Sequence, residues 1–381
     1  MIKRVFGDLK RMDKILLISS IILLVVGLIM VFSASNVASS VKLNNRSFYF
    51  YRHLIFIGVG LFIAFIAIVC NTKYYGPVSW VLTIVSIVTL ILTLMQPNTI
   101  NGSRSWLELS KNFSYQPSEF VKVISIVWMA HLCCSIPKLK LWVRYSLLFL
   151  IVGIIFALIA IEPDIGTGCI YLGTIFFMFL SLNKTPKTKR ILLISISIIA
   201  VIGSLVLFFT KANFLVERTK SRMNFTNPCS EEKFYTTGTQ LCNAYIAFNN
   251  GGLFGVGLGN STQKYLYLPE AYTDFIFAIV VEELGFIPSI LILGLMFVVL
   301  WRIYIIAKSA TTSYRRIMCY GIFWYILVHI IINVLGVTGI IPLTGVPLPF
   351  LSYGGSFIIC LITALGFVQR VNIETIYEKN Q

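Results

Sequence analysis

Residues 15–32 read ILLISSIILLVVGLIMVF, a run of eighteen positions without a charged side chain. A helix needs about 20 mainly apolar residues to cross the ~30 Å hydrocarbon core of a bilayer. With its flanks, this run predicts a membrane-spanning helix over 14–36. Comparable runs recur along the chain and predict nine further spans, at 50–70, 77–96, 118–136, 143–161, 164–182, 190–210, 272–301, 315–341 and 350–369.

The overall composition points to the same fold class. The 381 residues are 57% hydrophobic and 12% charged, and the mean hydropathy is +0.86, whereas soluble domains carry about 25% charged residues. The predicted class is all-α, a polytopic membrane helical bundle of about ten transmembrane helices. We expect a single domain over 1–381, with a large extracytoplasmic loop, 211–271, between spans seven and eight.

The basic residues, which give a formal net charge of +16, predict the orientation of the chain. With a cytoplasmic N-terminus, 19 of the 31 Lys and Arg residues fall in cytoplasmic segments, six in short outer segments and six in the long loop. Because Lys and Arg are enriched in short cytoplasmic loops, both termini are predicted to be cytoplasmic. No basic stripe interleaved with aromatic residues lies outside the membrane, which argues against a nucleic-acid partner.

The first 36 residues have one alternative interpretation, a cleaved signal peptide. A basic start leads to an apolar run and then to Ser33, Ala34 and Ser35. The run is longer than the roughly 7–15 apolar residues of a cleaved signal. We therefore expect a retained first helix, which also keeps the number of spans even.

The cysteines and histidines suggest little metal chemistry. Six of the eight cysteines lie in or beside predicted spans, whereas Cys229 and Cys242 lie 13 positions apart in the exported loop. That compartment permits disulfides, so a bridge and two free thiols both stay open. No Cys/His spacing resembles a zinc site. His53, His131 and His329 are isolated, and helix packing is the favoured interpretation.

Two short motifs near predicted helix starts carry charges that would be costly at membrane depth. Glu119 and Lys122 stand three apart on one helix face, where opposite charges pair, and Ser118 can cap that helix. Asp164 precedes the sixth span and can cap its first turn. In each motif, a structural role and a role in substrate binding both remain open.

A third motif, residues 268–278, runs from the exported loop into the predicted eighth span. Asp274 falls at the outer mouth of that span, where partial burial would raise the pKa of its carboxyl and suit it to act as a general base. The alternative is a charge that stabilises the helix N-terminus. If 272–301 is one helix, Glu282 lies ~12 Å deeper than Asp274, and Glu283 lies on the opposite face.

Glycine and proline mark two irregular segments. Residues 251–259 are glycine-rich, but no strand precedes them and no Gly-Lys-Ser/Thr follows, so a close-packed turn is expected rather than a nucleotide loop. Prolines at 342, 347 and 349 interrupt the last two spans. Irregular backbone at membrane depth is tolerated where it is buried in protein or lines a cavity, so residues 352–356 are predicted to border a cavity or a tight helix crossing.

Four blocks, at 115–120, 162–167, 268–278 with 282–285, and 347–356, together resemble the SEDS family of bacterial cell-wall proteins, which comprises FtsW, RodA and SpoVE. The resemblance covers nearly the whole chain, and residues 257–270 are more similar to the FtsW branch. The chain departs from the family pattern at Tyr272, where His is usual, and at Phe357, where a second Ser is common. A Cys229–Cys242 bridge is not a family feature.

The resemblance implies a peptidoglycan glycosyltransferase that polymerises lipid II at the outer face of the bacterial cytoplasmic membrane, in cell division. It implies that Asp274 is the catalytic aspartate. Substrate-binding roles are expected for Arg52, Arg104, Glu119, Lys122, Asp164, Lys264 and Glu270, with Arg218, Lys220 and Arg222 as further candidates for the pyrophosphate. The expected partners are lipid II (undecaprenyl-pyrophosphate-linked disaccharide peptide), a monofunctional class B penicillin-binding protein transpeptidase and other division proteins. A divalent cation, Mg²⁺ or Mn²⁺, is left open.

Two other functions stay open at this point, a lipid II flippase and a non-catalytic division scaffold. A flippase would need charged residues along several helices through the middle of the membrane. The acidic residues here gather at the predicted outer face, with Glu282 and Glu283 as exceptions. A scaffold would tolerate neutralisation of Asp274, whereas an enzyme would not.

Overall fold

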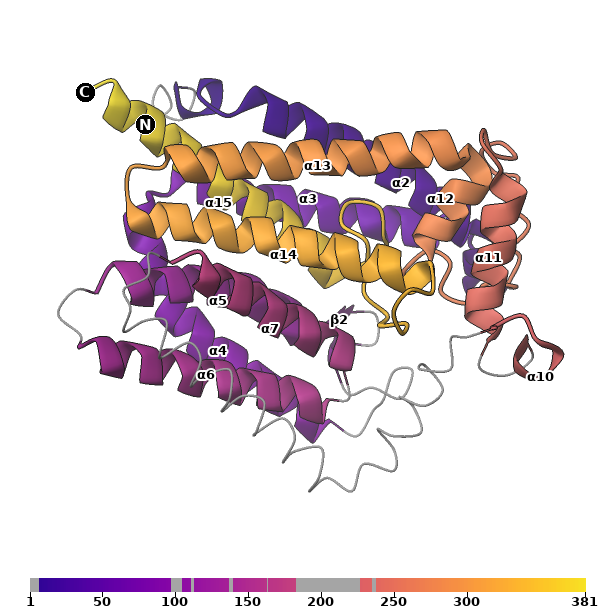
Figure 1. The fold of residues 1–381 in the computed structure, drawn as a ribbon, viewed down its shortest axis with the longest axis horizontal. Coiled ribbons are helices and arrows are strands. Elements are labelled where there is room, and N and C mark those ends of the chain that lie inside the picture. The colour runs from indigo at the N-terminus through magenta and orange to yellow at the C-terminus, as the bar shows by residue number, and fades with distance from the viewer. Residues whose placement is uncertain are drawn as a thin grey trace.

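The structure is a computed structural model that describes residues 7–96, 105–110, 113–136, 140–162, 164–182, 227–234 and 238–381. Its long helices run roughly side by side in one bundle (Figure 1). They are α2 (Lys14–Leu43), α3 (Phe48–Val69), α4 (Tyr75–Met95), α5 (Pro117–Cys134), α6 (Leu141–Ile161), α7 (Ile165–Leu180), α13 (Phe286–Ser309), α14 (Ser313–Val337) and α15 (Gly355–Lys379). In the described part, eight helices are long and apolar enough to cross a membrane, and α7 is shorter.

The predicted fold class is confirmed, but the number of spans stays a prediction. The seventh predicted span, 190–210, and the loop up to residue 226 lie outside the described residues. The division into a single domain is likewise a sequence-based expectation.

The two helices at the centre of the bundle are α5 and α15, which are the most buried of the described spans. Helix α15 packs closely on α3 because small residues face each other. A Cβ at Gly366 would lie 2.9 Å from the Cα of Ala64. Small residues at such crossings let two backbones approach in the membrane, where packing rather than the hydrophobic effect holds helices together. The peripheral helix α4 instead exposes apolar side chains such as Val81 and Ile84, as a lipid-facing surface requires.

The eighth predicted span is wrong as a single helix. It divides into α12 (Ile276–Leu284) and α13, with Gly285 between them at φ +91°. The cause is a tertiary contact, since a Cβ at Gly285 would lie 2.4 Å from the backbone nitrogen of Gly255. A positive φ and such a close approach both require glycine. Helix α12 therefore packs beside α11 (Thr239–Gly251) at the end of the bundle, at an angle to α13 (Figure 1).

The start of α12 at Ile276 corrects one expectation. Asp274 precedes α12 and is not part of a helix, so Glu282 does not lie deeper along the same helix. Glu282 instead accepts hydrogen bonds from Ser261, Thr262 and Asn250. The glycine-rich stretch 251–259 is a packed turn, as predicted, with positive φ angles at four glycines.

The remaining elements are short. The strands β1 (Leu107–Ser110) and β2 (Phe113–Tyr115) form an antiparallel hairpin, η1 (Thr72–Tyr74) precedes α4, and α10 (Glu231–Phe234) precedes α11. Cys229, just before α10, and Cys242, in α11, form a disulfide. Residues 338–354 form no helix, so α14 ends earlier and α15 begins later than predicted.

The described ends of the chain lie at the same end of the bundle (Figure 1). Arg370 on α15 binds Asp8 at 3.1 Å, and Asp13, which caps α2, pairs with Arg302 in the second half of α13. Arg315 binds Glu374 at 2.7 Å. An even number of spans predicts this arrangement, and the side of the membrane stays a prediction.

Candidate active site

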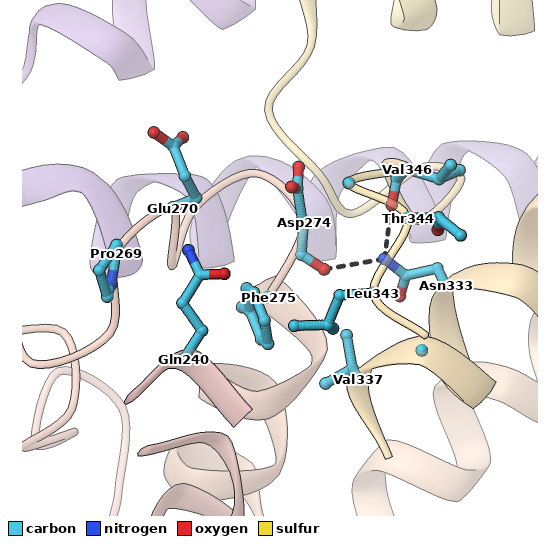
Figure 2. Close-up of a pocket in the computed structure, with 12 residues that line it drawn as sticks. Gln240, Pro269, Glu270, Asp274, Phe275, Asn333, Val337, Leu343, Thr344 and Val346 are labelled. Carbon is cyan, nitrogen blue, oxygen red and sulfur yellow. Dashed lines mark hydrogen bonds between the residues drawn. The ribbon is translucent and has the colours of Figure 1, made fainter. Parts of the chain in front are cut away.

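Two cavities meet at Asp274, at the end of the bundle where α2 ends and α3 begins. The main cavity has a volume of about 490 Å³, and the side cavity about 330 Å³. Asp274, Glu270, Thr344 and Gly345 line both of them. The charged residues of the main cavity are Lys42, Arg52, Glu119, Asp164, Glu270 and Asp274. The side cavity carries the amides of Gln240 and Asn333 among apolar side chains (Figure 2).

The backbone of Asp274 is fixed by Asn333, a residue of α14. The Asn333 Nδ2 donates to the carbonyl of Asp274 at 2.8 Å and to that of Val346 at 2.7 Å (Figure 2). One amide thus joins the segment before α12 to the irregular segment before α15. Gly345, at φ +72°, lies beside the carboxylate, and a Cβ there would be 3.3 Å from Asp274 Oδ2. The backbone of Asp274 is therefore held between the cavities, with its half-buried carboxylate beside Gly345.

Glu270 is held by an unusual turn four residues before Asp274. Its φ is +58°, a left-handed conformation that non-glycine residues seldom adopt. Thr273 stabilises the turn, because its backbone N–H donates to the carbonyl of Glu270 at 3.1 Å and its hydroxyl donates to Glu270 Oε2 at 3.0 Å. The Glu270 and Asp274 carboxylates point to the same side in Figure 2.

Asp164 both caps α7 and lines the main cavity. It accepts from the Thr167 N–H at 3.1 Å and from the Thr167 hydroxyl at 2.8 Å, so the predicted capping is confirmed. Gln116 also donates to its Oδ2 at 3.3 Å. The predicted cap by Ser118 is wrong, because Gln116 precedes Pro117 at the start of α5 and Ser118 lies inside the first turn.

The predicted pairing of Glu119 with Lys122 is confirmed, with 2.8 Å between Oε1 and Nζ. Glu119 lines the main cavity, whereas Lys122 lies behind it and is 1% exposed. The geometry thus gives Lys122 no direct contact surface for a pyrophosphate. His329 is also not a simple packing residue, since its Nε2 lies 3.2 Å from Lys122 Nζ.

Lys264 lies outside both cavities. Its buried ammonium donates to Glu283 at 2.8 Å, to Ser33 at 3.2 Å and to the carbonyl of Gly259 at 2.6 Å, which uses all three donors. These contacts hold the glycine-rich turn against α2 and α12. Its expected role as a substrate ligand therefore has no support in the geometry. Arg104, Arg218, Lys220 and Arg222 lie outside the described residues.

Among the described residues, Lys42 and Arg52 are the cations that line the main cavity. Arg52 was expected there, whereas Lys42 was considered only for orientation. Nothing in the local sequence marks Lys42 as a cavity residue. It comes near Arg52 because the chain reverses direction between α2 and α3, and the two residues are 10 positions apart. Aromatic rings form the adjoining wall, with Tyr49 stacked on Tyr272 at 4.7 Å and 5.2 Å from Tyr353.

Glu162 is buried just outside this site, directly after α6. Burial raises the pKa of its carboxyl to about 8, and the nearby charge of Asp164 acts in the same direction. Its proton is therefore retained near neutral pH, in contrast to an exposed glutamate.

The carboxylates lining the main cavity are of the oxygen-donor type that Mg²⁺ and Mn²⁺ prefer. Within the described residues, however, no three side chains of Asp, Glu, His or Cys come together in a way that could hold a metal ion. The described residues therefore do not fit a complete metal site.

Comparisons with known proteins give a consistent result over nearly the whole chain. Residues 13–377 match the FtsW/RodA/SpoVE family of cell cycle proteins. The chain is 37% identical to the probable peptidoglycan glycosyltransferase FtsW of Coxiella burnetii, covering 95% of this chain and 96% of that protein. It is also 37% identical to stage V sporulation protein E of Bacillus subtilis, covering 94% and 96%.

Solved structures of two other proteins share the fold. A chain of a peptidoglycan synthase complex that coordinates polymerization and crosslinking superposes with a TM-score of 0.74 at 21% identity, covering 96% of this chain and 98% of that one. The crystal structure of the rod shape determining protein RodA of Thermus thermophilus superposes with a TM-score of 0.65 at 23% identity, covering 95% and 96%. The helical arrangement therefore recurs in proteins with a very different sequence.

Proposed function

This chain belongs to the FtsW/RodA/SpoVE family of cell cycle proteins, and on that premise we propose that it is a peptidoglycan glycosyltransferase with Asp274 as its catalytic base. It polymerises lipid II at the outer face of the cytoplasmic membrane. The relatives named peptidoglycan glycosyltransferase FtsW, 37% identical in one case, support this activity and a role in cell division. The observation that carries the mechanism is the position of Asp274 between two cavities.

The reaction joins the 4-hydroxyl of one lipid-linked disaccharide to the anomeric carbon of the growing chain. The new C–O bond forms as the bond from the anomeric carbon to the lipid pyrophosphate breaks. The hydroxyl proton passes to the Asp274 carboxylate. A positioned base of this kind contributes roughly 10²–10⁴ in rate.

Among the described residues, cationic side chains line the main cavity and not the side cavity, which supports an assignment of the two substrates. The main cavity carries Lys42 and Arg52, whose cationic groups suit the pyrophosphate that leaves the growing chain. Arginine in particular presents a fork that matches phosphate oxygens. The side cavity offers the amides of Gln240 and Asn333, which suit a sugar with neutral hydroxyls. Asp274 then faces the acceptor hydroxyl from the boundary of the two cavities.

The carboxylates of the main cavity have a supporting role in this proposal. Glu119, Asp164 and Glu270 each line the cavity and accept hydrogen bonds from neighbouring groups. They would bind hydroxyl and amide donors of the disaccharide peptide. Arg104 belongs to the proposal as a further pyrophosphate ligand on the basis of the family resemblance alone.

The partner proposed for this chain is a class B penicillin-binding protein transpeptidase, along with other division proteins. The similar fold of a chain from a complex that couples polymerization with crosslinking supports this assignment. Both termini are cytoplasmic in the proposal, and the cavities open at the outer face, as the basic residues predict.

Purified protein, with a candidate transpeptidase, incubated with lipid II should produce glycan polymer that is resolved on a gel. The wild-type protein should form polymer and Asp274→Asn should not. Lipid II transport across vesicles by both proteins, without polymer from either, would instead favour a flippase. The described ion pairs do not favour transport, because they lie towards the two ends of the bundle.

A further inference from the structure

A chain of three buried polar side chains extends from the wall of the main cavity into α14. Lys122 Nζ lies 2.8 Å from Glu119 Oε1 and 3.2 Å from His329 Nε2. His329 Nδ1 lies 2.7 Å from the carbonyl oxygen of Tyr325. Glu119, Lys122 and His329 are 2%, 1% and 0% exposed, so water does not compete for these contacts.

The contacts determine the tautomer of His329. A carbonyl oxygen can only accept a hydrogen bond, so Nδ1 carries the proton. An ammonium can only donate, so Nε2 presents its lone pair to Lys122. A protonated imidazole would instead put two cations 3.2 Å apart in an apolar interior, where their repulsion would be large. His329 is therefore a neutral acceptor that directs the Lys122 ammonium.

Two rings restrict the position of the imidazole. Phe357 stacks on it with 4.9 Å between ring centroids and 30° between planes. Tyr325 meets it edge-on at 4.5 Å. Phe357 also lines the main cavity, so its ring separates His329 from that space. The imidazole is thus packed in one orientation but does not itself contact a molecule in the cavity.

At the cavity end of this row of side chains, one oxygen of Glu119 is an unused hydrogen-bond acceptor. Glu119 lines the main cavity, and its Oε2 has no hydrogen-bond partner among the described residues. A buried carboxylate oxygen without a hydrogen-bond partner costs more free energy than a buried neutral group in the same situation. A donor supplied by the substrate would satisfy it, and a disaccharide peptide brings both hydroxyl and amide N–H groups.

We propose that His329 is a positioning residue for substrate binding: it orients Lys122, which holds the Glu119 carboxylate so that Oε2 accepts a hydrogen bond from a hydroxyl or amide of the lipid-linked disaccharide peptide. This assignment rests on the proposed function for the identity of the substrate. It gives His329 a part in binding at a distance from the reacting atoms, without direct contact with the substrate.

The test compares His329→Leu with His329→Gln in the full chain. Leucine removes the acceptor, whereas the side-chain carbonyl of glutamine can still accept from Lys122. Binding of fluorescent lipid II is measured in an Asp274→Asn background, in which substrate is not consumed, and polymerisation kinetics are measured with Asp274 intact. We expect about tenfold weaker binding and a tenfold higher KM for His329→Leu, with kcat changed less than threefold. His329→Gln should stay within about threefold of wild type in both.

Glu119→Gln should weaken binding by a similar factor, and adding His329→Leu to it should change little more. If His329→Leu does not accumulate in membranes, His329→Met fills the same space with only a weak sulfur acceptor and carries the same expectation. Unchanged binding in the folded acceptor-free variant, or equal impairment of the Gln and Leu variants, would overturn the proposal. If the variants bind lipid II in this order but the wild-type protein makes no polymer, the proposed enzymatic function is refuted and the positioning role stands.

Discussion

Replacing Asn333 by Ala removes the amide that joins the two segments around Asp274. Two hydrogen bonds are lost, to the carbonyls of Asp274 and Val346. Each contributes about 0.5–1.5 kcal/mol, so the free energy of unfolding should fall by about 1–3 kcal/mol. The larger effect should be on catalysis, because a displacement of about 1 Å of a catalytic group costs on the order of 10²-fold in rate. We expect kcat for lipid II polymerisation to fall by about that factor.

The measurement combines thermal unfolding in detergent with polymerisation kinetics of the purified variant. Asn372→Ala is a matched control, because the Asn372 amide donates to the carbonyl of Arg11 at 3.0 Å near the opposite end of the bundle. The control should lose a comparable amount of stability per hydrogen bond and keep its kcat. A fully folded Asn333→Ala protein with wild-type kcat would refute the argument that this amide fixes the position of Asp274.

Three further predictions concern stability. Glu119→Gln and Lys122→Met should each cost several kcal/mol, because a buried charge loses its partner, and the double variant should cost less than their sum; additive losses would contradict the pairing. The pKa of Glu162 is raised from 4.5 to about 8, so ionisation of this side chain lowers the stability of the folded protein as the pH rises through that interval. Glu162→Gln should therefore raise the unfolding temperature at pH 9 more than at pH 5, and equal shifts at the two pH values would contradict this prediction. The Cys229–Cys242 disulfide closes a short loop and should stabilise it by roughly 3 kcal/mol; mass spectrometry should find the linked peptides, and two free thiols in oxidised membranes would contradict this, while activity should survive reduction.

Features set by neighbouring residues were predictable from the sequence. Asp164 caps α7 through Thr167, and Glu119 pairs with Lys122, because both contacts lie within one turn of a helix. Most spans within the described residues were predictable because apolar runs of sufficient length have few alternatives in a membrane. Residues 353–356 border the main cavity, as the prolines and glycines around them predicted.

Features set by distant contacts were not predictable. The apolar sequence continues on both sides of Gly285, and the helix breaks there because the backbone of Gly255 lies against it. His329 meets Lys122 across 207 positions, and no local pattern reports that contact. Asn333 lines the side cavity and donates to two backbone carbonyls. From the sequence alone it is one polar residue in an apolar helix, and nothing nearby identifies its two acceptors.

The proposed mechanism depends most directly on Asp274, and one measurement tests this role. Asp274→Asn keeps the shape of the side chain and its backbone contact with Asn333 but cannot accept the hydroxyl proton. The purified variant, inserted normally and still bound to its partner, should polymerise lipid II at least ~10²-fold more slowly than the wild-type protein. Polymer formation by Asp274→Asn at close to the wild-type rate would contradict the assignment of Asp274 as the catalytic base.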